Sequence, residues 1–129
     1  MNDELLALLV HNQAESFRAL DQALLGQGIR TEHARSCSEA SATLRRSCLP
    51  RLIFTDPNLT DGTWADVLTL ARMHGRVIPV IVVSRLVDID LYLRTLEGGA
   101  TDFIVPPLSP ADVAHVVKMA IGERRAASA

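Results

Sequence analysis

Polar residues follow the ends of several short apolar runs, and their types could support chemistry. These residues are His11, Asn12, Asp56, Ser84 and Arg85. A carboxylate is a ligand that Mg²⁺ prefers, while a guanidinium pairs well with phosphate and other small anions. Such groups can act together only if the fold brings the ends of these runs to one place.

Five apolar runs have the length and composition of strands that are buried on both faces. They are Glu4–Val10, Ile29–Ala34, Arg51–Thr55, Ile78–Ser84 and Asp102–Val105. Strands that alternate with single helices predict a parallel sheet with right-handed crossovers and helices on both faces. We therefore expect an α/β fold of the (βα)₅ type, in which the polar residues share the carboxyl edge of the sheet.

The segments between these runs carry apolar residues at helical spacing. The stripes are Ala14, Phe17, Leu20 and Leu24; Cys37, Ala40, Leu44 and Cys48; Trp64, Val67, Leu68 and Ala71; Ile89, Leu93 and Leu96; and Val113, Val116, Val117 and Ala120. Helix starts are indicated by Asn12 with Glu15, Ser36 with Glu39, and Ser109 with Pro110. Helix ends are indicated by Gly26 and Gly98.

Length and composition indicate one globular domain. The chain has 129 residues, of which 48% are hydrophobic and 22% charged, with a formal net charge of −2. This balance favours neither a nucleic-acid-binding nor a membrane-surface domain, and no apolar stretch approaches the ~20 residues of a membrane span. We expect residues 1–122 to form the domain, residues 123–129 to form a tail or linker, and the protein to be cytoplasmic.

Several kinds of site are argued against by the sequence. No glycine-rich loop follows the first run, which argues against a nucleotide site. No G-x-S-x-G motif is present and Ser84 has no apparent histidine base, which argues against a hydrolase. Cys37 and Cys48 form no zinc pattern, and we expect both to be small buried residues on one helix face in a reducing compartment. The chain is expected not to be an enzyme.

Two segments resemble motifs of a known family. TDPNLTDG, at Thr55–Gly62, is similar to the D-x-N-L-P-D-G loop of receiver domains of two-component response regulators. LEGGATDF, at Leu96–Phe103, is similar to their L-x-x-G-A-x-D-[YF] signature. The resemblance spans nearly the whole chain. It implies a flavodoxin-like (βα)₅ three-layer sandwich around a five-stranded parallel sheet, and a role in phosphorelay signalling.

The resemblance also implies roles for single residues. In the family, an aspartate after the third strand accepts a phosphoryl group from a kinase histidine, beside a Mg²⁺ ion. Asp56 matches this phospho-acceptor, and Asn58 matches the position whose backbone carbonyl meets the metal. Ser84 and Phe103 match the residues that switch conformation. Pro107 matches a proline that often follows a cis peptide bond.

The family's other ionic groups are missing at the matching positions. His11 and Asn12 stand in place of an acidic pair, and Pro106 stands in place of a lysine; Lys118, the only lysine, belongs to the last expected helix. We therefore expect no metal, or weak Mg²⁺ binding at Asp56 and the residue two positions on. An acyl phosphate on Asp56 would lack both charges that normally stabilise it.

The favoured function is a receiver that regulates through protein contacts, without phosphorylation. In the family, the fourth helix, the fifth strand and the fifth helix form the surface for dimerisation or contact with an output domain. Asp90, Leu91, Tyr92 and Arg94 are the candidate interface here, with a solvated face as the alternative. The partner would be a kinase, an output domain or a second copy of the chain, with no direct contact to nucleic acid or membrane.

Other functions stay open. Arg85 could supply the missing cation, so that Asp56 is phosphorylated in a pocket with unusual ligands. Alternatively, the domain could bind a small anion near Asn12, Ser84 and Arg85. His11 is expected to be a surface histidine at a strand end; contact with Asp56, which would make the pocket sensitive to pH, is the alternative.

Overall fold

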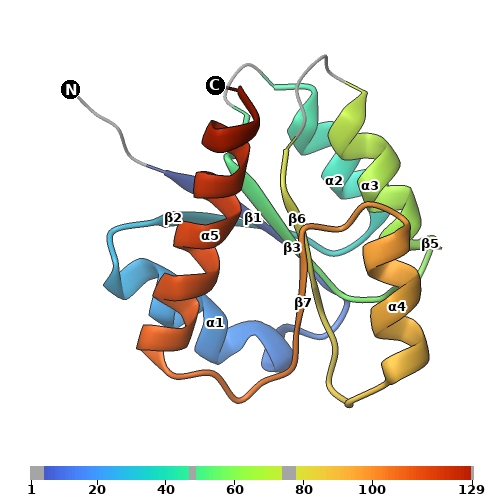
Figure 1. The fold of residues 1–129 in the computed structure, drawn as a ribbon. Helices are drawn as coiled ribbons and strands as arrows, with labels where there is room; N and C mark the ends of the chain where they lie inside the picture. The colour runs from blue at the N-terminus through green and yellow to red at the C-terminus, as the bar shows by residue number, and fades with distance from the viewer. Residues whose placement is uncertain (1–4, 47–48, 74–77, 129) are drawn as a thin grey trace.

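Five parallel strands form the central sheet of the computed structural model, in the order β2–β1–β3–β6–β7 (Figure 1). They are β1 (Leu6–Val10), β2 (Arg30–Ala34), β3 (Leu52–Thr55), β6 (Val80–Val83) and β7 (Asp102–Ile104). The structure describes residues 5–46, 49–73 and 78–128. All five expected strands are present, but the expectation of burial on both faces is wrong for the edge strand β2, where only Ala34 is buried. The order reverses between β1 and β3 as in other flavodoxin-like sheets.

Helices cover both faces of this sheet (Figure 1). They are α1 (Ala14–Gly26), α2 (Cys37–Leu44), α3 (Trp64–Arg72), α4 (Ile89–Glu97) and α5 (Pro110–Ser128). α1 and α5 pack on one face, α2 and α3 pack on the other, and α4 contacts the edge strand β7. A short hairpin, β4 (Asn58–Leu59) and β5 (Gly62–Thr63), joins β3 to α3. α5 continues beyond Gly122 into the segment expected to be a tail.

The side chains of β3 show why this strand is mostly apolar. Leu52 and Phe54 pack in the cluster beneath α1 and α5, whereas Ile53 packs in the cluster beneath α2 and α3. All three side chains are fully buried. Because helices cover both faces, the first polar side chains, Thr55 and Asp56, come only at the carboxyl end of the strand, and both are buried there.

The expected helix caps are confirmed for α2 and α5. Ser36 Oγ accepts a hydrogen bond from the backbone N–H of Glu39 at 3.1 Å, and Ser109 Oγ accepts one from Asp112 at 3.1 Å. After α4, Gly99 has φ +107°, a conformation that favours glycine. These local signals mark where α2 and α5 begin and where α4 ends.

The helix cap expected at Asn12 is wrong by one residue. Gln13 is the N-cap of α1, and its side chain makes no capping hydrogen bond. The backbone N–H of Asn12 is instead directed to the carboxylate of Asp56. The loop between β1 and α1 is therefore bonded to the residue that follows β3.

The apolar stripe expected on α4 is also wrong. Ile89 and Leu93 are 70% and 49% exposed, whereas Thr95 is fully buried. The Thr95 hydroxyl donates to the backbone oxygen of Tyr92 at 2.9 Å, which satisfies its polar group inside the helix. α4 covers only a sheet edge, so most of its apolar residues remain in solvent.

Close packing joins α3 to the end of α4. The indole ring of Trp64, the first residue of α3, lies against Gly98. A Cβ atom at Gly98 would lie 2.9 Å from the nearest ring atom, so a larger residue there would displace the indole. Trp64 is half-buried, as expected for a packing residue.

Cys37 is half-buried at the start of α2, rather than buried as expected. Asp61, in the β4–β5 turn, accepts hydrogen bonds from the backbone N–H groups of Cys37 and Ser38 at 2.7 and 3.0 Å. Burial, with the negative charges of Asp61 and Asp66, raises the pKa of the Cys37 thiol to about 11. Cys48 lies outside the described residues, and α2 ends at Leu44.

We expect Cys37 to be a poor nucleophile, because only the thiolate reacts. In a Cys48→Ser variant at pH 8, alkylation by iodoacetamide should be about 10²-fold slower than that of an unperturbed cysteine, since the pKa is raised by about two units. Asp61→Asn should accelerate it by removing the nearest negative charge. Mass spectrometry measures both rates, and a wild-type rate equal to that of a free thiol would contradict the assignment.

Candidate functional site

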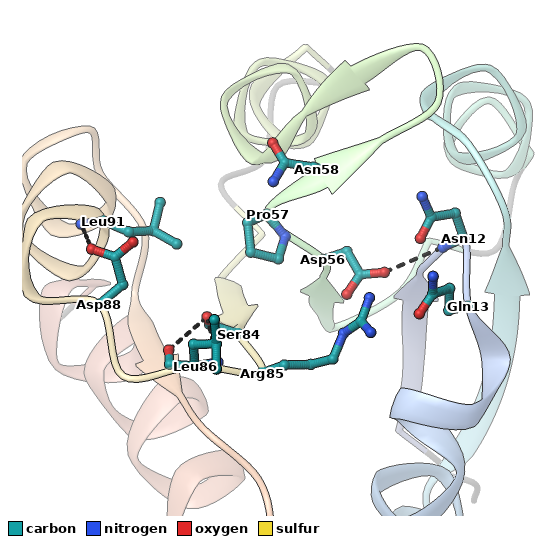
Figure 2. A pocket seen from close by; sticks show the side chains of 10 residues that line it. All are labelled: Asn12, Gln13, Asp56, Pro57, Asn58, Ser84, Arg85, Leu86, Asp88 and Leu91. Atoms are coloured by element: carbon teal, nitrogen blue, oxygen red, sulfur yellow. Dashed lines mark hydrogen bonds between the residues drawn. The ribbon is translucent and has the colours of Figure 1, made fainter.

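A pocket of about 530 Å³ opens at the carboxyl edge of the sheet, around the ends of β1, β3 and β6 (Figure 2). It is lined by Asn12, Gln13, Asp56, Pro57, Asn58, Ser84, Arg85, Leu86, Asp88 and Leu91. The polar residues expected at the ends of the first, third and fourth strands, except His11, therefore meet in one place, as the parallel topology requires.

Asp56 is the acidic group at the floor of this pocket and is 4% exposed. Its Oδ2 accepts a hydrogen bond from the backbone N–H of Asn12 at 3.2 Å. Burial raises the pKa of Asp56, and the Asn12 N–H and the charge of Arg85 oppose this rise. The carboxylate is thus held in place with few compensating partners.

Arg85 follows β6 and extends across the pocket toward Asp56 (Figure 2). Its side chain is exposed apart from this approach, and its positive charge lowers the pKa of Asp56 against the effect of burial. Asp88 also lines the pocket, but its Oδ1 accepts a hydrogen bond from the backbone N–H of Leu91 at 3.0 Å and caps α4. Among the residues that line the pocket, Arg85 supplies the positive charge that faces Asp56.

The two candidate switch residues make contacts away from Asp56. The Ser84 hydroxyl donates to the backbone oxygen of Leu86 at 2.8 Å and accepts from its N–H at 3.2 Å. Phe103 on β7 is half-buried and meets the ring of Tyr92 edge to face, with centroids 5.6 Å apart. Both side chains are thus engaged with the β6–α4 loop or with α4.

The expected surface location of His11 is wrong. Its side chain is 3% exposed, and its Nε2 lies 2.8 Å from Nδ1 of His33 on β2. The ring also packs on Phe17 of α1. His11 is therefore turned toward β2 and α1 and contributes no side chain to the lining of the pocket that contains Asp56.

Pro106 also lies away from this pocket. It lines a small separate cavity with Val83 and Leu108. The peptide bond between Pro106 and Pro107 is cis, as expected. Pro106 offers no cation in place of the family's lysine.

Some lining residues were not anticipated from the sequence. Gln13, Pro57, Leu86 and Asp88 all lie within a few residues of an expected strand end. Their proximity to those ends was the available signal, but it does not indicate which side chains turn inward. Among the described residues, no group of three or more His, Cys, Asp or Glu side chains is arranged to hold a metal ion.

The candidate interaction residues lie on α4 beside an unusual set of apolar side chains. Asp90, Tyr92 and Arg94 are exposed, with Asp90 and Arg94 paired at 3.3 Å, while Leu91 is half-buried in the pocket wall. The exposed large hydrophobic residues of the β6–α4 loop and α4, here called the α4 apolar face, are Leu86, Val87, Ile89, Tyr92 and Leu93.

The chain belongs to the response regulator receiver domain family, whose profile matches residues 7–118. The chain is therefore a receiver domain of two-component signalling. None of the described helices has both the length and the apolar character that crossing a membrane requires.

Full-length regulators are among its relatives. The chain is 29% identical over 103 residues to the alginate biosynthesis transcriptional regulatory protein AlgB of Pseudomonas putida, covering 80% of this chain and 23% of AlgB. It is 31% identical over 119 residues to the transcriptional regulatory protein PrrA of Mycobacterium bovis, covering 91% of this chain and 50% of PrrA. The chain thus spans a quarter to a half of these relatives.

Solved structures agree with the fold. A putative response regulator from Chloroflexus aurantiacus superposes with a TM-score of 0.84 at 22% identity, covering 93% of this chain and 99% of that one. The receiver domain of a putative LuxO repressor protein from Vibrio parahaemolyticus gives 0.82 at 22% identity, covering 97% of this chain and 95% of that one.

We expect Asp56→Asn to stabilise the domain at neutral pH. Burial raises the pKa of Asp56 in the folded state above its unfolded value of about 3.9. The contribution of Asp56 to the free energy of unfolding is therefore most favourable below pH 3.9, and it is lost as the pH rises through the folded-state pKa. The melting temperature of Asp56→Asn should exceed that of wild type by about 2–5 °C at pH 7, and by less near pH 4. Circular dichroism measures this difference.

Asp88→Asn is the matched control for that substitution. Asp88 is an exposed helix cap, and asparagine caps a helix about as well as aspartate. Its melting temperature should therefore stay close to that of wild type. A lower melting temperature for Asp56→Asn at pH 7 would show that the carboxylate is a net stabilising group.

Proposed function

We propose that this receiver domain regulates through protein contacts and does not depend on phosphorylation of Asp56. The observation that carries this proposal is the charge of the pocket. Mg²⁺ requires several oxygen ligands, with carboxylates prominent among them. Of the two acids that line the pocket, Asp88 caps α4, and Asp56 already faces the guanidinium of Arg85. These residues do not fit a Mg²⁺ ion.

The surroundings of Asp56 also offer little support for a phosphoryl group. Phosphoryl transfer is catalysed mainly by positioning and by cations that neutralise developing charge. The position that carries a lysine in the family is Pro106, which lines a different cavity. The hydroxyl of Ser84 is engaged by Leu86. The domain would then act as a binding module, without catalytic turnover of its own.

The alternative is a working receiver in which Arg85 replaces the missing cations. Arginine binds phosphate well, and its guanidinium extends toward Asp56 (Figure 2). The two functions differ in one measurable property, the accumulation of an acyl phosphate on Asp56. Binding of a small anion near Asn12, Ser84 and Arg85 remains a hypothesis.

Incubation with acetyl phosphate and Mg²⁺, followed by intact mass measurement, tests the proposal. We expect no added phosphoryl group, because neither a metal nor a lysine would neutralise it. A gain of one phosphoryl group that is absent in Asp56→Ala would contradict the proposal. If that group also disappears in Arg85→Ala, the alternative is correct.

A restored variant provides the positive control for this assay. Asn12→Asp introduces an acidic side chain among the lining residues, and Pro106→Lys places a lysine at the position that carries one in the family. Modification of Asp56 should then become faster by roughly 10²-fold or more, the size of effect that one well-placed electrostatic group has on a rate. Such a gain would show that the residues at these two positions prevent phosphorylation of the wild-type chain.

The α4 apolar face supports contact with a partner protein. Leu86, Val87 and Ile89 are 74%, 81% and 70% exposed, and a contiguous set of exposed large hydrophobic residues marks an interaction site more often than an isolated one. The face would be covered by a kinase, by an output domain of the full-length protein or by a second copy of the chain. Its charged neighbours Asp90 and Arg94 neutralise each other.

Self-association can be tested on this face directly. Ile89→Asp with Leu93→Asp places charges among exposed apolar residues, so the melting temperature should change little, because surface substitutions usually alter stability by less than ~0.5 kcal/mol. If a second copy is the partner, sedimentation should show a dimer in wild type and at least a tenfold weaker one in the variant. A wild-type chain that stays monomeric at millimolar concentration excludes the second copy as partner.

A further inference from the structure

A network of polar side chains runs from the surface into the interior beside the pocket. The Thr31 hydroxyl donates to Asp21 Oδ1 at 2.6 Å, and Asp21 Oδ2 lies 3.4 Å from His33 Nε2. His33 Nδ1 in turn lies 2.8 Å from His11 Nε2. This network joins α1, β2 and the residue that follows β1. Its His33 side chain is 40% exposed, whereas His11 is 3% exposed.

The side chain of His11, at the buried end of this network, has a single polar contact. The His11 ring packs on Phe17 with centroids 4.9 Å apart, and meets the His33 ring edge to face at 5.1 Å. His11 Nδ1 is buried and has no hydrogen-bond partner among the residues that the structure describes. The charged and titratable groups that act on the ring are Asp21 on α1, His33 on β2 and Arg35 directly after β2.

The negative charge of Asp21 favours one arrangement of the protons in the neutral pair. A proton on His33 Nε2 faces the Asp21 carboxylate 3.4 Å away, and in this tautomer His33 Nδ1 is an acceptor. His11 must then donate from Nε2. Its Nδ1 is left without a proton, in surroundings that offer it no partner.

One further proton destabilises this pair at either of the positions open to it. On His33 Nδ1, the proton removes the acceptor of the His11 Nε2–H, and His11 could compensate only by carrying its own proton on the unpartnered Nδ1. On His11 Nδ1, the proton creates a buried cation. Burial, His33 and Arg35 lower the pKa of His11, and Asp21 opposes them only in part.

His11 is directly connected to the pocket through the backbone. Its N–H donates to the carbonyl oxygen of Ala34 at 2.9 Å, and the next residue, Asn12, holds the carboxylate of Asp56. We propose that the His11–His33–Asp21 network is a proton-responsive latch. It holds the end of β1 against β2 and α1 at neutral pH, and an added proton releases it and moves Asn12 relative to Asp56.

This regulation rests on the proposed function in one respect: neither a metal nor a phosphoryl group already controls the pocket. The direction of the pH effect follows from the lowered pKa of His11. The folded state binds this proton less readily than the unfolded chain, whose histidine value is about 6.5. Stability from this group is therefore complete above pH 6.5 and is lost as pH falls toward the folded value.

Nuclear magnetic resonance of the ¹⁵N-labelled chain tests the latch without any substitution. Long-range ¹H–¹⁵N spectra at pH 7.5 should show His11 and His33 with their protons on Nε2. On titration to pH 5, the amide resonance of Asn12 should shift with the midpoint of His11, which lies below the ordinary histidine value of about 6.5. A His11 midpoint at or above that value, or an Asn12 amide that does not follow His11, would overturn the proposal.

Substitution supplies a second measurement. Between pH 7.5 and 5.5, wild type should lose about 2–6 °C more in melting temperature than His11→Gln, which keeps a hydrogen-bonding side chain but does not titrate. His115 is an exposed residue of α5 and provides the matched control. His115→Gln should keep the wild-type dependence of melting temperature on pH. Equal pH dependence in wild type and His11→Gln would count against the latch, and the spectra decide the matter if His11→Gln does not fold.

The titration is carried out without Mg²⁺ or acetyl phosphate. A phosphorylated Asp56 in the separate mass assay would therefore overturn the proposed function while leaving the pH transition as measured. Conversely, an absent transition would overturn the latch alone.

Discussion

The burial of one carboxylate at the edge of the sheet is the main physical constraint on the pocket of this domain. Asp56 is almost fully enclosed, and a single backbone N–H from Asn12 bonds to it. A buried charge is costly unless it is compensated, so the groups around it determine what the domain can do. Metal and lysine perform this compensation in the family that the chain resembles, whereas here Arg85 approaches from β6. The positive charge of Arg85 offsets part of the cost of burying Asp56.

Local contacts join the pocket to α4. The Ser84 hydroxyl bonds to Leu86 in the β6–α4 loop, and Phe103 on β7 packs on Tyr92 of α4. α4 keeps most of its apolar residues in solvent, because it covers only the edge strand β7. The pocket wall and the α4 apolar face are therefore parts of one helix and the loop that precedes it.

Most of the fold could be predicted, because strands buried on both faces leave a strong apolar signal and parallel topology then places Asp56, Ser84 and Arg85 together. Predictions failed where a partner is distant in sequence. His11 was expected at the surface because nothing adjacent in the sequence shows that its hydrogen-bond partner is His33, 22 residues later. The stripe of α4 failed because apolar spacing does not reveal how much sheet a helix has to cover. Asp88 was not expected in the pocket because its side chain direction depends on the cap that it forms.

The contact between Trp64 and Gly98 has a practical consequence. The chain has one tryptophan, and its indole ring lies where the first turn of α3 meets the last turn of α4. The same ring borders a groove that also contains Arg94. Because indole emission depends on solvent exposure and nearby charge, any motion of α4 away from α3 changes the light that this residue emits. The domain therefore contains an intrinsic optical probe of its own helix movements, with no label to attach.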